Sequence, residues 1–236
     1  MESGVPKAGR PLDRTNVAAV IPAYHEEAHV RGVAERACAQ IDRVVVIDDG
    51  SGDATAARAR EGGAEVIMHP ENRGKGEAIK TGLRHWLAQA EIEFVLLFDA
   101  DGQHLPEEIS RFFAAAAASE ASLFIGTRMH DVRHMPFVRR TVNRYVSRRI
   151  SRLCGQQVPD TQCGYRMIHR TLVPHLLAGT SRFDYETEML IIASRAGFRI
   201  ASVPISTIYS DELSSIHPVR DTIRFFRLMR RYEKTA

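Results

Sequence analysis

Two carboxylates separated by one residue follow an apolar run at residues 94–98. They are Asp99 and Asp101, with Gly102 directly after them. The run is short and rich in aromatic and branched residues, which is typical of a strand buried on both faces. Because side chains two residues apart on a strand point the same way, the two carboxylates should converge at its carboxyl end. Such hard oxygen ligands suit Mg²⁺ or Mn²⁺. The motif alone leaves a solvated Asp-Gly turn as the alternative.

Polar clusters also follow two other predicted strands. Segments 17–21 (ended by Pro22), 44–47 and 64–68 have strand composition. Helical segments are expected at about 28–40, in a stretch after Asp53 that ends at about 61, at 77–90, and from Pro106 onward. This alternation predicts an α/β fold, with a doubly wound, mostly parallel sheet and helices on both faces. The clusters at 24–26, 48–51 and 99–101 fall at strand ends, where such sheets bind ligands. Their recurrence favours a functional site over three unrelated turns.

The composition is that of an ordinary globular protein. The chain has 236 residues, 44% hydrophobic and 26% charged, with a net charge of +3 and arginine concentrated in the second half. Three cysteines without paired spacing predict a reducing cytoplasm and neither a disulfide framework nor a zinc site. The first 16 residues are polar, with Gly and Pro, so we expect no signal peptide. Since no run approaches about 20 apolar residues, membrane contact should be peripheral.

Lys75 lies between two glycines just before a predicted helix. A glycine-flanked lysine at a helix start could cradle a phosphate, or it could be a solvated loop residue. The segment is not a Walker A loop, and no dinucleotide-binding glycine fingerprint follows the first strand.

A basic amphipathic segment occupies residues 133–153. Arg140, Arg144 and Arg148 recur at helical spacing, beside a stripe of apolar residues. This pattern suits an anionic membrane surface. An ordinary core-packed helix with solvated arginines is the alternative. A second basic amphipathic stretch at 221–232 could lie on a membrane or cap the core.

Four ordered motifs carry a resemblance to a known family. They are Val20-Ile21-Pro22-Ala23-Tyr24-His25-Glu26, Asp48-Asp49-Gly50-Ser51-Gly52-Asp53, Asn72-Arg73-Gly74-Lys75-Gly76 and Asp99-Ala100-Asp101-Gly102-Gln103. Together they resemble the family 2 glycosyltransferases of the GT-A fold. Among these the match is to enzymes that make polyprenyl- or dolichyl-phosphate sugars, such as dolichyl-phosphate mannosyltransferase. The resemblance covers roughly residues 16–230, with later matches at 126–128, 160–166 and 183–188.

The resemblance implies a nucleotide-sugar donor, a divalent cation and inversion at the anomeric carbon. Positions matching the family's nucleoside contacts are Pro22, Ala23, Tyr24, Glu26, Ile47 and Asp49. The metal–diphosphate positions are Asp99, Ala100, Asp101 and Gln103, with Asp99, Asp101 and Gln103 as the expected metal ligands, and Lys75 joins the donor site. We expect residues 1–15 to form a flexible tail and 16–236 a single domain. Within it, 16–128 would bind the nucleotide sugar, and 129–236 the acceptor through amphipathic segments, including C-terminal amphipathic helices.

The catalytic task in such a transfer is to neutralise charge on the departing diphosphate. A cation on Asp99 and Asp101, assisted by Arg128, would do this. A phosphate acceptor needs no general base, only cations to hold it; the candidates are Arg128, Arg140, Arg144 and Arg166.

The chain departs from the family pattern at four positions. His25 stands where Asn is usual, and Cys163 where Ser is commoner. The segment 209–218 resembles the lid over the donor, but Ser215 replaces the expected Lys and an expected Arg near Thr207 is missing. The lid's contacts with the diphosphate should therefore differ.

The expected function is a metal-dependent inverting transfer of a sugar to a polyprenyl or dolichyl phosphate at the cytoplasmic membrane face. The donor would be GDP-mannose or UDP-glucose. One alternative is a saccharide or small-molecule hydroxyl acceptor, which would require a carboxylate base. The others are a sugar-phosphate nucleotidyltransferase, whose Gly-rich loop after the first strand is missing, and a non-enzymatic nucleotide-binding module. Expected partners are the two substrates and a membrane surface, not nucleic acid; a separate membrane-anchor subunit stays open.

Overall fold

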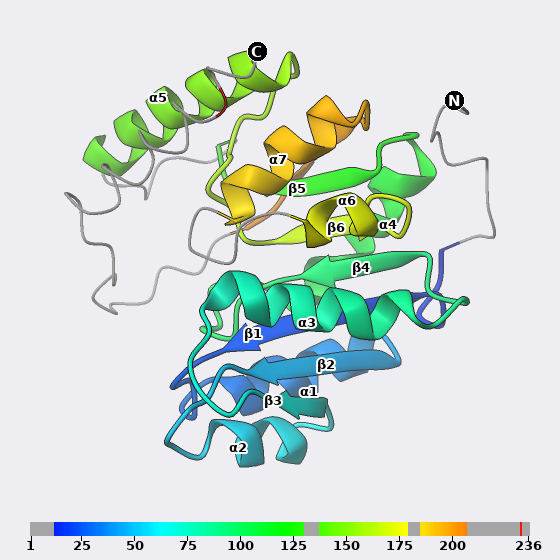
Figure 1. Ribbon diagram of the computed structural model, residues 1–236, viewed down its shortest axis with the longest axis vertical. Coiled ribbons are helices and arrows are strands. Elements are labelled where there is room, and N and C mark those ends of the chain that lie inside the picture. The colour runs from blue at the N-terminus through cyan, green and yellow to red at the C-terminus, as the bar shows by residue number, and fades with distance from the viewer. Residues whose placement is uncertain (1–11, 130–136, 179–184, 207–231, 233–236) are drawn as a thin grey trace.

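The computed structural model describes residues 12–129, 137–178, 185–206 and Tyr232. Its centre is a seven-stranded sheet in the order β3-β2-β1-β4-β6-β5-β7 (Figure 1). The strands are β1 (Val17–Ala23), β2 (Arg43–Asp48), β3 (Glu65–Met68), β4 (Phe94–Leu97), β5 (Leu123–Thr127), β6 (Arg166–His169) and β7 (Ile200–Pro204). Neighbours are parallel except at β6, which is antiparallel to β4 and β5. The predicted mostly parallel α/β sheet is confirmed.

Helices cover both faces of this sheet. They are α1 (Val30–Gln40), α2 (Thr55–Glu61), α3 (Lys75–Leu87), α4 (Ile109–Ala117), α5 (Phe137–Cys154), α6 (Val173–Leu177) and α7 (Tyr185–Arg195). A short 3₁₀ helix at Pro106–Glu108 precedes α4. Helix α3 packs on β1 and β2 and joins α6 and α7 on one face, while α1 packs on β2 on the other. In the part of the chain that the structure describes, no helix is long and apolar enough to cross a membrane.

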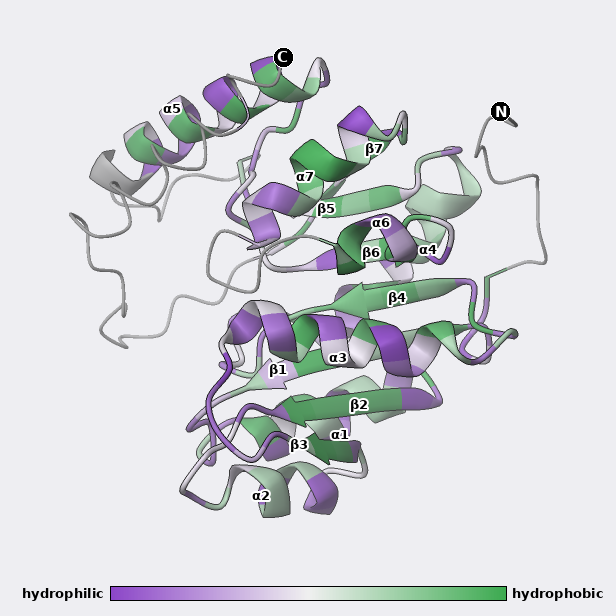
Figure 2. Ribbon diagram, in the orientation of Figure 1, coloured by the Kyte–Doolittle hydropathy of each residue, from purple (hydrophilic) through white to green (hydrophobic). Residues whose placement is uncertain are grey.

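The central strands and α3 fit closely together. Strand β4 is buried along its whole length, and the strands are the most uniformly hydrophobic part of Figure 2. Gly82 lies against the sheet, because a Cβ there would come 2.4 Å from Val20 Cγ1. Trp86 Nε1 donates to the Ala19 carbonyl oxygen at 3.0 Å. These contacts fix α3, and with it Lys75 in its first turn.

Strands β1 and β4 part at their carboxyl ends, and we call this point of divergence the β1–β4 crevice. β1 pairs with β4 only from Val17 to Val20, whereas Pro22 and Ala23 pair with β2 alone. The strand thus runs two residues beyond the predicted end, and a proline is tolerated where one ladder partner is missing. The chain leaves β1 toward β2 on one side, and β4 lies on the other, so this is a topological switch point, where α/β sheets bind ligands.

Three predictions lie wholly or mostly outside the described residues, and one of them is the tail at 1–15, of which residues 1–11 are not described. The lid at 209–218 and nearly all of the amphipathic stretch at 221–232 belong to segments that the structure does not describe. The division into donor and acceptor halves stays a prediction, although the sheet takes β6 and β7 from the second half.

Candidate active site

The predicted acidic pair lies at the carboxyl end of β4. Asp99 and Asp101 follow directly after the strand, and Ala100 between them is buried. Asp101 Oδ1 accepts the Gln103 backbone N–H at 2.9 Å, and Gly102 turns the chain with φ +74°. The turn therefore exists, but it holds the two carboxylates at the crevice instead of dispersing them in solvent.

Lys75 is brought to the same place from the other side of the crevice. Its ammonium Nζ lies 2.6 Å from Asp99 Oδ1 and 3.2 Å from Glu186 Oε2. Gly74, with φ +94°, turns the chain into the first residue of α3. The glycine-flanked lysine is thus part of the acidic cluster, not a solvated loop residue.

The three charges shift one another's proton affinities. Burial acts against the charged form of Asp99, but the neighbouring Lys75 ammonium outweighs it and lowers the pKa of that carboxyl. Burial, together with the charge of Asp99, raises the pKa of Asp101. Although burial opposes it, the carboxylates of Asp99 and Glu186 raise the pKa of Lys75. Lys75 therefore compensates Asp99, while Asp101 has no ion-pair partner among the residues that the structure describes.

Two residues at the site escaped the sequence prediction. Glu186, in the first turn of α7, belongs to the matched segment 183–188; the structure puts Glu186 at Lys75 and buries Glu188, which accepts from the Tyr232 hydroxyl at 2.5 Å. Gly164 lies against the cluster, because a Cβ there would be 2.9 Å from Asp99 Oδ2 and 3.1 Å from Glu186 Oε1. The only signal for Gly164 was its place in the motif at 160–166.

The residues after β1 are tied to the end of β2. The His25 backbone N–H donates to Ser51 Oγ at 3.0 Å, and the Glu26 N–H donates to Thr55 Oγ1 at 2.9 Å. Tyr24 is 46% exposed and makes an edge contact with His25. Tyr24 is therefore presented at the surface of the crevice, as a ligand-stacking residue must be.

The other predicted nucleoside positions are more enclosed. Ile47 is fully buried, so it can reach a ligand only through its main chain. Asp49 is also buried, and its carboxylate accepts the backbone N–H groups of Arg73 (3.0 Å) and Gly74 (2.7 Å). His69 Nδ1 lies 2.6 Å from the same carboxylate. Asp49 thus holds the loop that carries Lys75.

Arg128, predicted as a phosphate ligand, is paired with a buried carboxylate. Its Nε and Nη2 contact the two Asp160 oxygens at 2.8 and 3.0 Å, and its backbone N–H donates to Oδ2 at 3.2 Å. The Arg128 side chain is 10% exposed and that of Asp160 is 0% exposed. This bidentate pair fixes the start of the loop that leads to Gly164.

The prediction that Arg166 binds the acceptor does not fit its position. Arg166 is fully buried in β6. Its guanidinium donates to the carbonyl oxygens of Cys163 (3.0 Å), Thr161 (3.3 Å) and Glu186. Because these donors bind main-chain carbonyls inside the protein, Arg166 positions the Gly164 loop and α7 from beneath the site.

Helix α5 faces the protein with a mixed polar and apolar side and faces outward with a basic side that includes two exposed apolar residues. Asn143 and Ser147 are buried, and the Ser147 hydroxyl contacts Thr161 through Oγ1 (3.2 Å) and the backbone N–H (3.1 Å). Val142 and Tyr145 are 53% and 51% exposed. The arginines Arg144, Arg148 and Arg152 are exposed, and Arg140 is half-buried. Figure 2 shows the alternating colours along α5. Ile150 and Cys154 are buried in the core, so one side of α5 packs on the core as the alternative interpretation held, while Val142 and Tyr145 keep apolar surface exposed.

Helix α5 also begins near the side of the molecule that carries the site. In Figure 1 its first turns lie on the side toward which β1, β2 and β4 point. It packs against α7, the helix that carries Glu186. Arg140 and Arg144 lie in its first two turns.

The acidic pair suits a cation that arrives with its own ligands. Within residues 12–129, 137–178 and 185–206, no three His, Cys, Asp or Glu side chains form a metal-binding group. Two neighbouring carboxylates, of which Asp101 has no ion-pair partner in the described part of the chain, match the way Mg²⁺ binds through one or two carboxylates plus phosphates and water. The donor set therefore fits a hard divalent cation bound together with a diphosphate.

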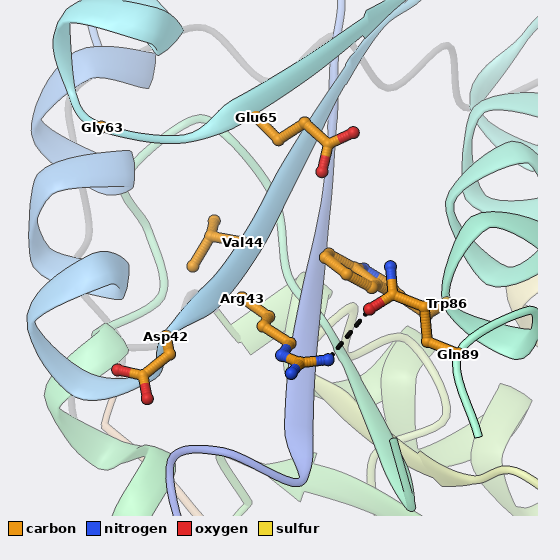
Figure 3. A pocket seen from close by; sticks show the side chains of 7 residues that line it. All are labelled: Asp42, Arg43, Val44, Gly63, Glu65, Trp86 and Gln89. Carbon is orange, nitrogen blue, oxygen red and sulfur yellow. Dashed lines mark hydrogen bonds between the residues drawn. The ribbon is translucent and has the colours of Figure 1, made fainter. Parts of the chain in front are cut away.

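A separate pocket lies at the opposite end of β2 (Figure 3). It has a volume of about 350 Å³ and is lined by Asp42, Arg43, Val44, Gly63, Glu65, Trp86 and Gln89. Arg43 Nη1 donates to Gln89 Oε1 at 2.9 Å, the contact dashed in the figure. Arg43 begins β2 whereas Asp48 ends it, so this pocket takes no part in the acidic site.

Comparisons with known proteins agree with this architecture. A family model described as glycosyl transferase family 2 matches residues 18–177. A UDP-N-acetylglucosamine–dolichyl-phosphate N-acetylglucosaminyltransferase from Methanococcus voltae is 29% identical over 215 residues, covering 81% of this chain and 85% of that protein. A polyprenol monophosphomannose synthase from Mycolicibacterium smegmatis is 30% identical over 216 residues, covering 85% of this chain and 80% of that protein.

A solved structure shares the fold. Glucosyl-3-phosphoglycerate synthase from Mycobacterium tuberculosis, crystallised with Mn²⁺, uridine diphosphate and glucosyl-3-phosphoglycerate, superposes with a TM-score of 0.67. The match covers 93% of this chain and 79% of that one, at 21% sequence identity. At this identity the likeness bears on the fold alone, and it confirms the predicted GT-A arrangement.

Proposed function

Because the chain belongs to glycosyl transferase family 2 and is a glycosyltransferase, we propose that it moves a sugar from a nucleotide sugar onto a polyprenyl phosphate. The observation that carries the proposal is the acidic pair Asp99 and Asp101 in the β1–β4 crevice, combined with an exposed basic and apolar face on α5. Family membership sets aside the nucleotidyltransferase and the non-enzymatic alternatives.

On the donor side, the chain supplies a negatively charged cradle. Asp99 and Asp101, with Gln103, would hold Mg²⁺ or Mn²⁺, which supplies positive charge to the diphosphate as the bond to the sugar breaks. Gly164 leaves room for the Asp99 carboxylate, and Lys75 lies beside it.

The nucleoside would lie across the ends of β1 and β2. Tyr24 offers an exposed ring, and the Glu26 backbone N–H bonds to Thr55 in the segment that follows β2. Pro22 and Ala23 form the wall at the end of β1, with the Ile47 main chain opposite. Asp49 would act by holding loop 69–74 against this wall. GDP-mannose and UDP-glucose are the proposed donors.

On the acceptor side, a phosphate monoester is already an anionic nucleophile. It needs cations that hold it without protonating it, and no general base. Arg140 and Arg144, at the start of α5, are proposed for this contact. Arg128 would act beside them, held in a fixed orientation by Asp160.

The lipid part of the acceptor explains the outward face of α5. Exposed Val142 and Tyr145 lie among Arg144, Arg148 and Arg152, which is the pattern of a helix at an anionic membrane surface. We place this surface at the cytoplasmic face, because the three cysteines are unpaired, as in a reducing compartment. Both relatives described above carry the name of a polyprenyl-type lipid acceptor.

Transfer to a hydroxyl acceptor is the second candidate, because Glu186 places a carboxylate at the site. A hydroxyl nucleophile would need such a base. However, the Lys75 ammonium holds Glu186 Oε2 at 3.2 Å, and this contact competes with proton abstraction. The phosphate acceptor requires no such step.

The test is a transfer assay with purified protein. GDP-mannose, UDP-glucose and UDP-N-acetylglucosamine are each incubated with Mg²⁺ or Mn²⁺ and either a short polyprenyl phosphate or the matching polyprenol. The expected product is a lipid-linked sugar from the phosphate only, detected by mass spectrometry. Transfer to the alcohol, or to neither lipid, would overturn the proposed acceptor.

Matched variants assign the two halves of the site. Asp101→Ala should lower transfer by at least about 100-fold, as should EDTA, with an unchanged circular dichroism spectrum. Asp42→Ala, an exposed carboxylate at the opposite end of the sheet, is the control. Arg144→Ala should raise the acceptor KM about tenfold with little change in the donor KM, whereas Arg60→Ala on α2 should change neither.

A further inference from the structure

Lys75 lies where a cation bound to Asp99 has to compete with it. Its ammonium is 2.6 Å from Asp99 Oδ1, a direct ion pair, and 3.2 Å from Glu186 Oε2. The side chains of Lys75, Asp99 and Glu186 are 25%, 26% and 22% exposed, so the contact opens to the crevice. A ligand can therefore reach it.

The cluster is also short of positive charge. Asp99, Asp101 and Glu186 together carry three negative charges when ionised, whereas Lys75 and the buried Arg166 beneath them supply two positive charges. A divalent cation would change this balance from net negative to net positive. Gly164 lies against both Asp99 and Glu186, so the two carboxylates are held close together beside the main chain of this loop. Charge balance therefore favours movement of the lysine when a metal arrives.

Lys75 has a suitable place to go. It is the first residue of α3, and a helix amino end favours anions. Its long, flexible stem carries a compact charge that can change partners. A diphosphate bound to a cation on Asp99 and Asp101 would lie within reach of the same side chain.

We propose that Lys75 is an exchangeable cation: it neutralises Asp99 before the donor binds and passes to the diphosphate when a divalent cation takes Asp99. This inference rests on the proposed function, because it takes the acidic pair as a metal site. It adds a residue that sets both metal affinity and diphosphate recognition, and the exchange breaks no covalent bond.

The first test measures Mn²⁺ binding without nucleotide, by electron paramagnetic resonance. Lys75→Met removes the competitor, so Mn²⁺ should bind about fivefold more tightly than to the wild type. Lys75→Arg keeps the charge and should resemble the wild type. Arg73→Met is the matched control, since this exposed cation lies two residues away and its nearest ion-pair contact is Glu77 at 4.0 Å. Equal affinity in Lys75→Met and the wild type would overturn the exchange.

The second test measures nucleotide affinity by calorimetry at saturating Mn²⁺. Lys75→Met should weaken binding of UDP or GDP about twentyfold, and binding of UMP or GMP much less, because the lost partner is the diphosphate. An equal change in the affinities for mono- and diphosphates would overturn the proposed movement of Lys75 to the diphosphate.

A third variant separates the two proposals. If Asp99→Asn binds Mn²⁺ as well as the wild type, the metal site of the proposed function is wrong. If Asp99→Asn loses Mn²⁺ while Lys75→Met does not gain it, the metal site stands and only the exchange fails.

Discussion

Lys75 and Arg128 are two cations held by carboxylates in opposite ways. The Lys75 ammonium is shared by Asp99 and Glu186, and all three side chains are partly exposed. Arg128 grips the fully buried Asp160 with two guanidinium nitrogens and its backbone N–H. An ammonium in a partly hydrated ion pair loses little free energy when it changes partners. A buried bidentate arginine–carboxylate pair, in contrast, cannot separate without leaving a buried charge unpaired. The site thus combines one exchangeable cation with one fixed cation.

The fixed cation belongs to the frame of the site. Asp160 begins the loop that brings Gly164 to Asp99, and Arg166 holds the same loop through the carbonyl oxygens of Thr161 and Cys163. Two arginines therefore set the position of the Gly164 loop. Lys75 faces this frame from α3 and can move relative to it.

The largest expected effect comes from neutralising the buried carboxylate. Asp160→Asn should lower the free energy of unfolding by about 3 kcal/mol, because it leaves the Arg128 guanidinium buried without its counter-charge. Asp99→Asn should change that free energy by less than about 1 kcal/mol, since its ion pair is partly exposed. Urea denaturation of both variants beside the wild type measures the difference. Equal losses in the two variants would erase the distinction between fixed and exchangeable cations.

A smaller effect is expected from filling the space beside the exchangeable cation. In Gly164→Ala the new Cβ would press on Asp99 Oδ2 at 2.9 Å and Glu186 Oε1 at 3.1 Å. These are ends of side chains, so the carboxylates should shift while the backbone stays. Transfer and Mn²⁺ affinity should each fall about tenfold, with stability changed by less than about 1 kcal/mol.

The control for this variant is Gly32→Ala on α1. A Cβ at Gly32 meets nothing within 4 Å, and helix propensity should stabilise that variant by up to about 1 kcal/mol. If Gly164→Ala instead lost stability and kept its Mn²⁺ affinity, Gly164 would belong to the fixed frame.

The fold and the acidic pair could be predicted because their signals are local. An apolar run followed by Asp99 and Asp101 encodes a buried strand with carboxylates at its end, and the alternation of such runs with helices encodes the sheet. The place of Lys75 was only half predictable. The glycines beside Lys75 indicate the start of a helix, but its partner Glu186 is 111 residues away in sequence.

The orientation of α5 and the burial of Arg166 could not be predicted for the same reason. Hydrophobic spacing alone did not show which part of the apolar stripe faces the core: Ile150 does, whereas Val142 and Tyr145 are exposed. Ser147 also lies inward, because Thr161 supplies a hydroxyl and an N–H for its Oγ. Arg166 looked like one more surface cation, yet main-chain carbonyls of a loop and of α7 satisfy it. Buried polar groups depend on partners that only the folded chain brings together.

The smallest effect is expected at His25, whose side chain is more exposed than those of Lys75 and Arg128. Its Nδ1 lies 3.6 Å from Asp53 Oδ2, with the His25 side chain 49% exposed, so the pair should contribute little. What the position demands is its backbone, since His25 has φ +57°, a conformation in which Asn, Asp and His are enriched. The family's Asn and this chain's His therefore both satisfy the requirement for a positive φ.

His25→Asn should leave stability within about 0.5 kcal/mol of the wild type and transfer unchanged, whereas the β-branched His25→Val should lower the free energy of unfolding by about 1–2 kcal/mol. Urea denaturation and the transfer assay measure these effects. If His25→Asn were as damaging as His25→Val, the imidazole itself would be required. An exposed side-chain contact would then contribute as much as a buried one, against the difference drawn between Lys75 and Arg128.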